Sequence, residues 1–563
     1  MNHAFSRRSF LKGGAATAAS AAFSLPAGAA APENDAPVSP LLVTRYGPVQ
    51  GKTQGDHLVW YGIPYGAPPT GEARWSAPLD PAHWSDPLDC TQPAPAAYQF
   101  SSCPIGSEDC LRLDVYTVPS AHALPVLVYL HGGNNQTGSS DSLPGGDLVE
   151  NDHCVFVSVN YRLGLFGFNC LPALCPGAED TGNFTLLDIA KALDWVRDNI
   201  SLFGGDPSNI TLSGFSAGGR DVMACLTSPL FTDRFQKAIS FSGGITFADE
   251  NASARQIAAA LAPLAVEDGR ATDENAAFRW LLTPDPSVQE WLYSVEPSRL
   301  CGIMTHAAIR MSAFPHLYQD DVVLPKAGFS AGPLNAVPLL LLTGSTEFSA
   351  CAYSDLYFSS ESVRELPTDQ LNAAKEFASR YGSAFYRRFN AEASAEVIAP
   401  HSSAPVYLGQ VEYGSPNSRI PLPPLGSFHG IMIPMLSREN SFNLYADFST
   451  AGYQAMAAQF NLYLRNFLAC GDPNRSDPDA SASPLWPAWT SDDRQSMIFD
   501  ADASSSYAVS RNVSVRSDTI LAEMDADTTL PAEQKTAIAR NVLNGRWFSD
   551  PIDRHYGNPS LWK

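Results

Sequence analysis

The stretch Ile210-Thr211-Leu212-Ser213-Gly214-Phe215-Ser216-Ala217-Gly218 decides the fold predicted for this chain. Its first four residues are predicted to form a strand, and a helix is predicted after Ser216. The pattern G-x-S-x-G lies between them, where small residues let the backbone turn sharply and raise the serine above a sheet. The N–H groups at the start of the helix favour an anion beside that serine. The stretch therefore predicts that Ser216 is a nucleophile.

Apolar runs on both sides of this stretch predict a mostly parallel sheet. Val126–Leu130 and Val155–Val159 are continuous apolar runs rich in β-branched residues, typical of strands that helices bury on both faces. Further strands are predicted at Ala238–Phe241 and Val337–Leu342. Between Leu186 and Val196, apolar residues recur at helical spacing. This alternation of strands and helices predicts the α/β class.

Other segments are predicted to elaborate the sheet. Segments of alternating pattern at Leu41–Thr44 and Leu58–Tyr61 flank turns rich in Gly and Asp, which predicts N-terminal antiparallel strands. The stretch 251–310 is interpreted as a helical insertion, and a long amphipathic helix is predicted from about Tyr453 to Leu468. Because no repeat and no obvious inter-domain linker interrupts the chain, we expect one domain over residues 41–563.

The first residues resemble a twin-arginine export signal. Ser6-Arg7-Arg8-Ser9-Phe10-Leu11-Lys12 precedes an Ala-rich apolar stretch and Ala27-Gly28-Ala29. We therefore expect an export signal at residues 1–29, a Pro-rich linker at residues 30–40, and a periplasmic or secreted protein. No later run approaches the roughly 18 apolar residues of a membrane span, so no stable membrane anchor is predicted.

Composition narrows the class of partner. Hydrophobic residues make up 45% and charged residues 17% of the chain, which is typical of a folded globular protein. The formal net charge is -22, so the overall field repels phosphate backbones. We therefore expect no nucleic-acid partner.

A second glycine-rich turn follows the predicted strand Val126–Leu130. It reads His131-Gly132-Gly133-Asn134, at the point where acyl-transfer enzymes of the α/β-hydrolase fold place oxyanion-hole donors. Each fixed amide can lower the barrier by about 3 kcal/mol. We therefore predict an oxyanion hole formed by Gly132, Gly133, Asn134 and Ala217.

Further motifs along the chain resemble the type-B carboxylesterase and cholinesterase-like family. In order, they include Gly62-Ile63-Pro64-Tyr65-Gly66, Glu108-Asp109-Cys110-Leu111, Asn160-Tyr161-Arg162, Gly182-Asn183-Phe184, Phe203-Gly204-Gly205-Asp206-Pro207 and Gly471-Asp472-Pro473-Asn474. The likeness covers roughly residues 41–490. It implies an α/β-hydrolase fold, with a mostly parallel central sheet flanked by helices, small N-terminal antiparallel strands and helical insertions.

The resemblance implies the other two members of a catalytic triad. The family's acid lies in a stretch after a buried strand that corresponds here to Gly344-Ser345-Thr346-Glu347, and its histidine in a motif that corresponds to His429-Gly430. The order Ser, Glu, His agrees with the fold. His429 would accept the Ser216 proton, Glu347 would orient the imidazole, and water would hydrolyse an acyl-enzyme. This implies a serine carboxylesterase for small-molecule esters that requires no metal or organic cofactor.

The resemblance also implies a disulfide. Cys110 in its Glu-Asp-Cys motif would pair with an upstream cysteine, for which Cys90 is favoured over Cys103, the alternative seven residues away.

Three sites depart from the family pattern. Asn134 replaces a third glycine, although asparagine tolerates an unusual φ better than other non-glycine residues. Phe215 stands where many members have Glu, and Ile431-Met432 replaces an acidic pair. The more apolar surroundings predict a preference for uncharged or aromatic esters over choline esters. Two alternatives stay open: a specialised esterase for aromatic-acid, lipid or carbamate substrates, and an inactive cholinesterase-like binding protein. Neither the physiological substrate nor the oligomeric state is predicted.

Overall fold

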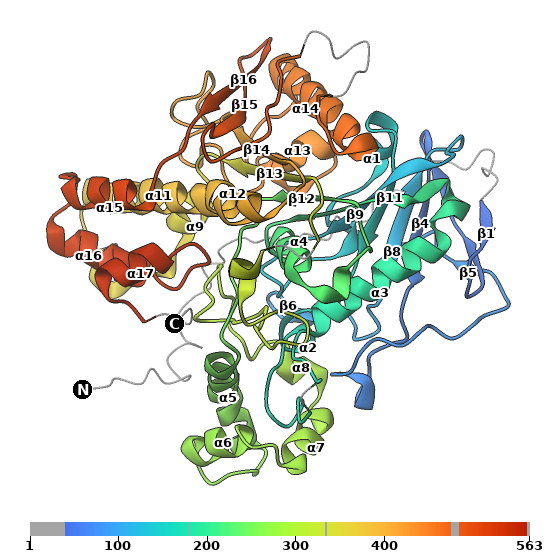
Figure 1. Cartoon of the computed structure of the whole chain (residues 1–563). Coiled ribbons are helices and arrows are strands. Elements are labelled where there is room, and N and C mark those ends of the chain that lie inside the picture. Colours follow the sequence, from blue (N-terminus) through green and yellow to red (C-terminus); the bar gives the residue numbers. More distant parts are fainter. Residues whose placement is uncertain (1–39, 178, 333–334, 475–482, 560–563) are drawn as a thin grey trace, which may run out of the picture.

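The computed structural model describes residues 40–177, 179–332, 335–474 and 483–559, and an eleven-stranded sheet forms its centre (Figure 1). The seven strands from β15 to β10 in the order below are parallel, and the four outer strands join the sheet antiparallel. From edge to edge the order is β16 (Ser506–Asn512), β15 (Gln495–Ala501), β14 (Val406–Val411), β13 (Leu339–Gly344), β12 (Lys237–Phe241), β11 (Gly205–Phe215), β9 (Leu124–Leu130), β10 (Val155–Val159), β8 (Arg112–Thr117), β4 (His57–Pro64) and β3 (Lys52–Gln54). The predicted mostly parallel α/β sheet is confirmed.

The N-terminal strands are antiparallel, as predicted. β1 (Leu41–Val43) pairs antiparallel with β2 (Pro48–Gln50), and β5 (Leu88–Asp89) completes a small separate sheet by pairing parallel with β2. β4, which contains the predicted strand Leu58–Tyr61, instead pairs with β3 and β8 at one edge of the large sheet.

Helices cover both faces of the sheet, which explains the unbroken apolar runs. Val126 and Val128 of β9 belong to a large buried cluster that also contains residues of α3 (Phe184–Asn199), α4 (Ala217–Thr227) and α11 (Thr368–Asn390). Leu127 and Tyr129 point to the other face, where α1 (Gly146–Asn151), α13 (Ile433–Leu436) and α14 (Ala451–Cys470) lie. Successive residues of a strand thus enter two different cores. The predicted helices within α3 and α14 are both present.

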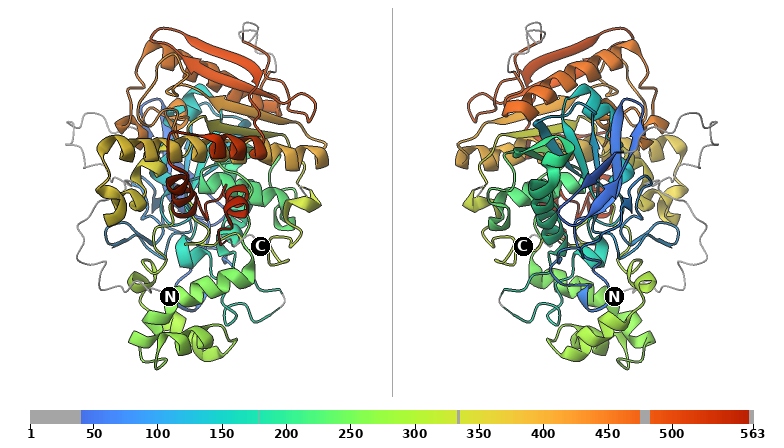
Figure 2. Two further views of the ribbon diagram at one scale, coloured as in Figure 1. Left: turned by 90° about the vertical axis from the view of Figure 1, so that its left-hand side faces the viewer. Right: turned by 90° about the vertical axis from the view of Figure 1, so that its right-hand side faces the viewer.

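The predicted insertion is helical over most of its length. It comprises α5 (Glu250–Glu267), α6 (Glu274–Leu281), α7 (Pro286–Ser294) and α8 (Pro297–Leu300), and α5–α7 project below the sheet in both Figure 1 and Figure 2. Residues 301–310, which were predicted to continue it, form turns and loops instead.

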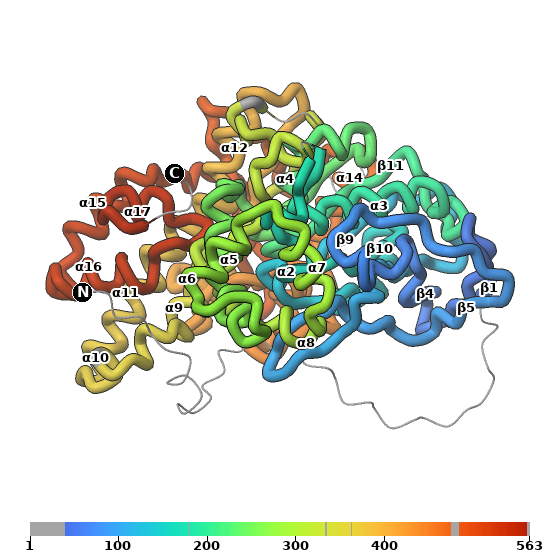
Figure 3. The backbone as a smooth tube through the Cα atoms, turned by 90° about the horizontal axis from the view of Figure 1, so that it is seen from below, coloured from blue at the N-terminus to red at the C-terminus, as the bar shows by residue number. Residues whose placement is uncertain are grey.

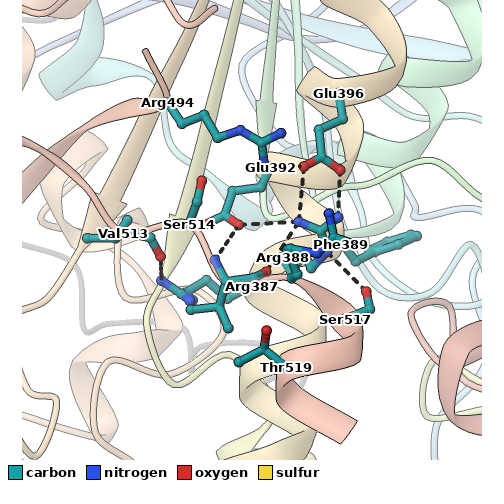
Figure 4. Close-up of polar contacts among 12 residues, drawn as sticks. Arg387, Arg388, Phe389, Glu392, Glu396, Arg494, Val513, Ser514, Ser517 and Thr519 are labelled. Carbon is teal, nitrogen blue, oxygen red and sulfur yellow. Dashed lines mark hydrogen bonds and ion pairs between the residues drawn. The ribbon is translucent and has the colours of Figure 1, made fainter. Parts of the chain in front are cut away.

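The C-terminal helices lie at the opposite end of the molecule from β1 and β5 (Figure 3). They are α15 (Ser517–Ala526), α16 (Ala532–Asn541) and α17 (Asp550–Tyr556), and the first two pack against α11. Polar contacts fasten the end of α11 (Figure 4): Arg388 forms ion pairs with Glu392 and Glu396 of α12 (Glu392–Ile398) and donates to Ser517 of α15.

The predicted disulfide between Cys90 and Cys110 is not formed, since both cysteines are free thiols in the structure, and both are buried. The alternative partner, Cys103, is also free and is exposed. Burial raises the pKa of both buried thiols, that of Cys90 to about 12. The motif around Cys110 is therefore present without the bond that it implied.

The predicted export signal at residues 1–29 lies outside the described residues, as does the predicted linker up to residue 39. Among the residues that are described, no helix is both long and apolar enough to span a membrane.

Candidate active site

The fold brings the three predicted triad residues to one edge of the sheet. Ser216 directly follows β11, Glu347 comes three residues after β13, and His429 lies in the loop that follows β14. The carboxyl ends of parallel strands share an edge, which is where ligands bind in α/β sheets. Residues far apart in the sequence can therefore meet there.

A continuous chain of hydrogen bonds joins the three side chains. Ser216 Oγ lies 2.8 Å from His429 Nε2, and His429 Nδ1 lies 2.5 Å from Glu347 Oε2. Ser216 is 5% exposed and Glu347 is fully buried. This geometry matches a serine nucleophile, a base within reach of its proton, and a carboxylate that orients the base.

A strained turn holds Ser216 in place. Its φ is 57° and its ψ is -116°, outside the regions that L-residues normally adopt. The turn depends on neighbouring glycines: a Cβ on Gly214 would lie 2.4 Å from the backbone of Gly218, and one on Gly218 would lie 2.2 Å from Leu130 O. The glycines of the G-x-S-x-G pattern thus allow the close approach that the motif predicted.

Three further donors hold the carboxylate of Glu347. Oε1 accepts hydrogen bonds from Gly344 N–H at 2.6 Å, from Ser242 Oγ at 2.6 Å and from Thr343 Oγ1 at 3.1 Å. These bonds compensate for removing the carboxylate from water and fix which oxygen faces His429. Ser242 and Thr343 were not predicted as site residues. The signal for Ser242 was its place directly after the predicted strand Ala238–Phe241, next to β11.

The predicted oxyanion loop lies against the nucleophile. A Cβ on Gly132 would lie 3.0 Å from Ser216 Cβ. Gly133 has φ 112° and Asn134 has φ 62°, so the asparagine adopts the left-handed conformation for which it was judged suitable. Within the described part of the chain, the N–H groups of Gly133, Asn134 and Ala217 donate to no other group. These amides are therefore free to receive an oxyanion.

A buried histidine supports this loop from behind. The ring of His131 stacks on Tyr161 at 4.4 Å, and Tyr161 Oη donates to His131 O at 2.5 Å. Burial lowers the pKa of His131 to about 4, so its ring is neutral at ordinary pH. His131 therefore has a structural role beside the site and adds no charge to it.

Aromatic rings flank His429. Phe215 lies 4.8 Å from the imidazole and Tyr386 of α11 stacks on it at 5.4 Å, centroid to centroid. Phe442 packs against Gly430 and against Phe215. Ile431 and Met432, two further departures from the family pattern, are fully buried. Phe215, at 8% exposed, is the departure that borders the nucleophile directly.

The described residues contain no group of three or more His, Cys, Asp or Glu side chains placed to hold a metal ion. The groups gathered at the site are those of acyl transfer: a hydroxyl, an imidazole, a carboxylate and backbone amides.

Comparison with known proteins identifies the family. Residues 38–362, more than half of the chain, match the carboxylesterase family. The chain belongs to the carboxylesterase family. The family predicted from the collinear motifs is thereby confirmed.

Individual carboxylesterases agree with this assignment. The para-nitrobenzyl esterase of Bacillus subtilis is 39% identical over 242 residues, which cover 41% of this chain and 49% of that protein. Esterase B1 of Culex pipiens is 36% identical over 256 residues, which cover 43% and 46%. The chain thus spans about half the length of the curated relatives that it matches.

Solved structures extend the likeness over more of the fold. A PNB esterase structure superposes with a TM-score of 0.65 at 26% identity, covering 84% of this chain and 97% of that one. A carboxylesterase of Geobacillus stearothermophilus, at 24% identity and a TM-score of 0.66, shares the fold over the same proportions. The α/β-hydrolase fold predicted from the sequence is confirmed.

Proposed function

We propose that this protein is a serine carboxylesterase in which Ser216, His429 and Glu347 form the catalytic triad. The observation that carries the proposal is the unbroken hydrogen-bond chain from Ser216 Oγ through His429 to the buried carboxylate of Glu347. Membership of the carboxylesterase family supports the class of reaction.

The reaction begins with attack of Ser216 Oγ on the ester carbonyl, while His429 Nε2 takes the hydroxyl proton. Glu347 accepts a hydrogen bond from Nδ1–H, stays ionised and stabilises the imidazolium that forms. The N–H groups of Gly133, Asn134 and Ala217 would bind the carbonyl oxygen as it becomes negative. The alcohol leaves with the proton from His429, and water, activated by the same imidazole, then hydrolyses the acyl-enzyme.

We further propose that the preferred substrates are neutral or aromatic esters. Phe215 presents an apolar ring beside Ser216 and His429, and Phe442 packs edge-on against it at 5.9 Å between centroids. The position next to the nucleophile therefore offers no carboxylate to a cationic choline group. Phe215→Glu should raise turnover of a choline ester relative to a neutral aryl ester of equal acyl length. An unchanged ratio, or faster choline-ester turnover by the native chain, contradicts this preference.

The deciding experiment compares the native chain with Ser216→Ala. Each is treated with a fluorophosphonate, and hydrolysis of a short-chain aryl ester is measured in parallel. Ser253→Ala, which replaces a buried serine of α5, is the matched control. We expect labelling and hydrolysis to vanish together in Ser216→Ala and to persist in the control. A folded native chain that neither labels nor hydrolyses supports a cholinesterase-like binding protein instead.

Export is a separate proposal that rests on Arg7-Arg8 and the apolar stretch after them. Replacing both arginines with lysine should retain the protein in the cytoplasm of a bacterial host with twin-arginine transport. Equal export of the native and double-lysine chains contradicts a signal of this type.

A further inference from the structure

A short C-terminal segment is buried against the candidate active site. The residues between α16 and α17 include Arg546, Trp547 and Phe548, which are at most 3% exposed. They lie beyond residues 38–362, where the family match ends. We call residues 546–548 the C-terminal clamp.

The clamp reaches the histidine of the triad through one aromatic residue. Phe548 stacks on Tyr386 at 5.1 Å and 28°, and Tyr386 stacks on His429 at 5.4 Å and 24°. Tyr386 is fully buried, and its hydroxyl has no hydrogen-bond partner in the described part of the chain. The phenol therefore contributes its ring rather than its polar atom.

The clamp also contacts residues next to the acid. Phe548 packs edge-on against Phe348 at 5.1 Å, and the Arg546 guanidinium lies 4.9 Å from the centre of the same ring. Phe348 directly follows Glu347. A shift of this ring would move the backbone that presents the carboxylate to His429.

The third contact is with the helix that begins at the nucleophile. The guanidinium of Arg220 on α4 lies 4.3 Å from the Trp547 ring, a cation–π contact that is stronger when buried. The backbone N–H of Arg220 donates to the carbonyl oxygen of Ser216 in the first turn of that helix. Thr246 joins the same group, because its hydroxyl donates to Trp547 O at 2.8 Å and its carbonyl accepts from Arg220 at 2.6 Å.

Backbone pairing connects the clamp to the oxyanion loop. Trp547 N–H donates to Ile309 O, so the clamp lies along the residues that end the insertion. Upstream on this stretch, Ala307 N–H donates to Gln136 Oε1 at 3.0 Å. The same oxygen accepts from Asn134 Nδ2 at 2.7 Å. One loop thus contacts the clamp at one end and the oxyanion hole at the other.

We propose that the C-terminal clamp positions the triad for the esterase reaction, with Phe548 and Tyr386 as positioning residues for His429. The inference rests on the proposed function, since it assigns a role within that same site. Tyr386 transmits the packing of Phe548 to the imidazole, whose Nε2 must meet Ser216 Oγ while Nδ1 meets Glu347. A displacement of about 1 Å at such a group can lower the rate a hundredfold.

The test measures kcat and KM for an aryl ester, together with the rate of fluorophosphonate labelling, in five full-length chains. They are the native chain, Tyr386→Leu, Tyr386→Phe, Phe548→Leu and the control Phe377→Leu. Phe377 is a buried aromatic residue on α11, like Tyr386, but it packs on Tyr381 away from His429. Thermal unfolding checks that each chain is folded.

We expect Tyr386→Leu and Phe548→Leu to lower kcat and labelling about tenfold to a hundredfold with little change in KM. Tyr386→Phe keeps the ring and should retain native activity, and Phe377→Leu should retain it as well. Phe548→Leu tests the contact from outside α11 if Tyr386→Leu does not fold.

Native kcat in folded Tyr386→Leu or Phe548→Leu overturns the proposal. So does an equal loss in Phe377→Leu, which would mean general loosening of α11, or an equal loss in Tyr386→Phe, which would assign the effect to the hydroxyl. A native chain that is not labelled refutes the esterase itself, and that result differs from a labelled native chain with unaffected variants.

Discussion

Replacing Glu347 with glutamine tests whether the carboxylate sets the tautomer of His429. Glu347 Oε1 accepts from Gly344 N–H and from the Ser242 hydroxyl. An amide NH₂ cannot accept these bonds, so the glutamine must place its carbonyl oxygen there and its NH₂ beside His429 Nδ1. Nδ1 must then accept a hydrogen bond, and the ring proton moves to Nε2. The nitrogen that faces Ser216 thereby loses the lone pair that takes the hydroxyl proton.

The size of the effect follows from this switch. In Ser-His-Asp triads, a wrong histidine tautomer with intact geometry costs about 10⁴ in kcat. At about 1.4 kcal/mol for each factor of ten, Glu347→Gln should raise the barrier by about 5.5 kcal/mol. Because Glu347 lies behind the imidazole, away from the nucleophile, KM should change little.

The assay is steady-state hydrolysis of an aryl ester combined with the rate of fluorophosphonate labelling. Glu412→Gln is a matched control, since Glu412 is also buried and accepts hydrogen bonds from Gln410 and Ser415. We expect native kcat in the control. A folded Glu347→Gln chain whose kcat falls less than about tenfold refutes the tautomer argument.

Three further substitutions test other parts of the structure. Ser242→Ala removes one donor to Glu347 Oε1 and leaves two, so kcat should fall about tenfold with unchanged KM; native kcat would show that the remaining donors suffice. Gly218→Ala places a Cβ 2.2 Å from Leu130 O on a central strand, so chemical denaturation should show a free energy of unfolding lower by about 3 kcal/mol; native stability contradicts the required close approach. Burial raises the pKa of Asp221 to about 7, so the folded state binds the proton of this carboxyl more tightly than the unfolded chain does. The protonated carboxyl therefore adds up to about 4 kcal/mol to the free energy of unfolding below about pH 4, and this contribution is lost as the pH rises to about 7. Asp221→Asn should therefore melt higher than the native chain at pH 8 and near it at pH 4, whereas a difference independent of pH is inconsistent with an ionised buried carboxylate.

Local pattern predicted the nucleophile because the elbow is a local structure. Ser216, its flanking glycines and the strands β9 and β11 all lie within short stretches whose residue types dictate the backbone. β14 was not predicted, and Gly409 in its interior weakens the strand pattern. Its packing explains the glycine, since a Cβ there would lie 2.6 Å from the Leu342 side chain and 2.8 Å from the Trp486 ring. A tertiary contact thus removed the local signal.

Glu347 and His429 could be predicted only through the likeness to a family. Neither residue lies in a local motif that indicates a catalytic role. The hydrogen bond between their side chains depends on how two loops, one after β13 and one after β14, come together at the edge of the sheet. Ser242 shows the same limit: its residue type is common, and only the fold places its hydroxyl 2.6 Å from Glu347.

The contacts of the clamp could not be predicted from the sequence. Trp547 and Phe548 are neighbours in a short connection without helical or strand periodicity, so local sequence can say only that the pair is apolar. Their partners Arg220 and Tyr386 come from α4 and α11, on elements fixed by other parts of the core. Packing on the triad's neighbours is therefore a property of the assembled fold. The motifs that carry the family likeness end before the clamp, so the chemistry and the contacts proposed to position it are encoded in different parts of the chain. On this proposal, a substitution in the clamp lowers the rate although the sequence of the triad itself is unchanged.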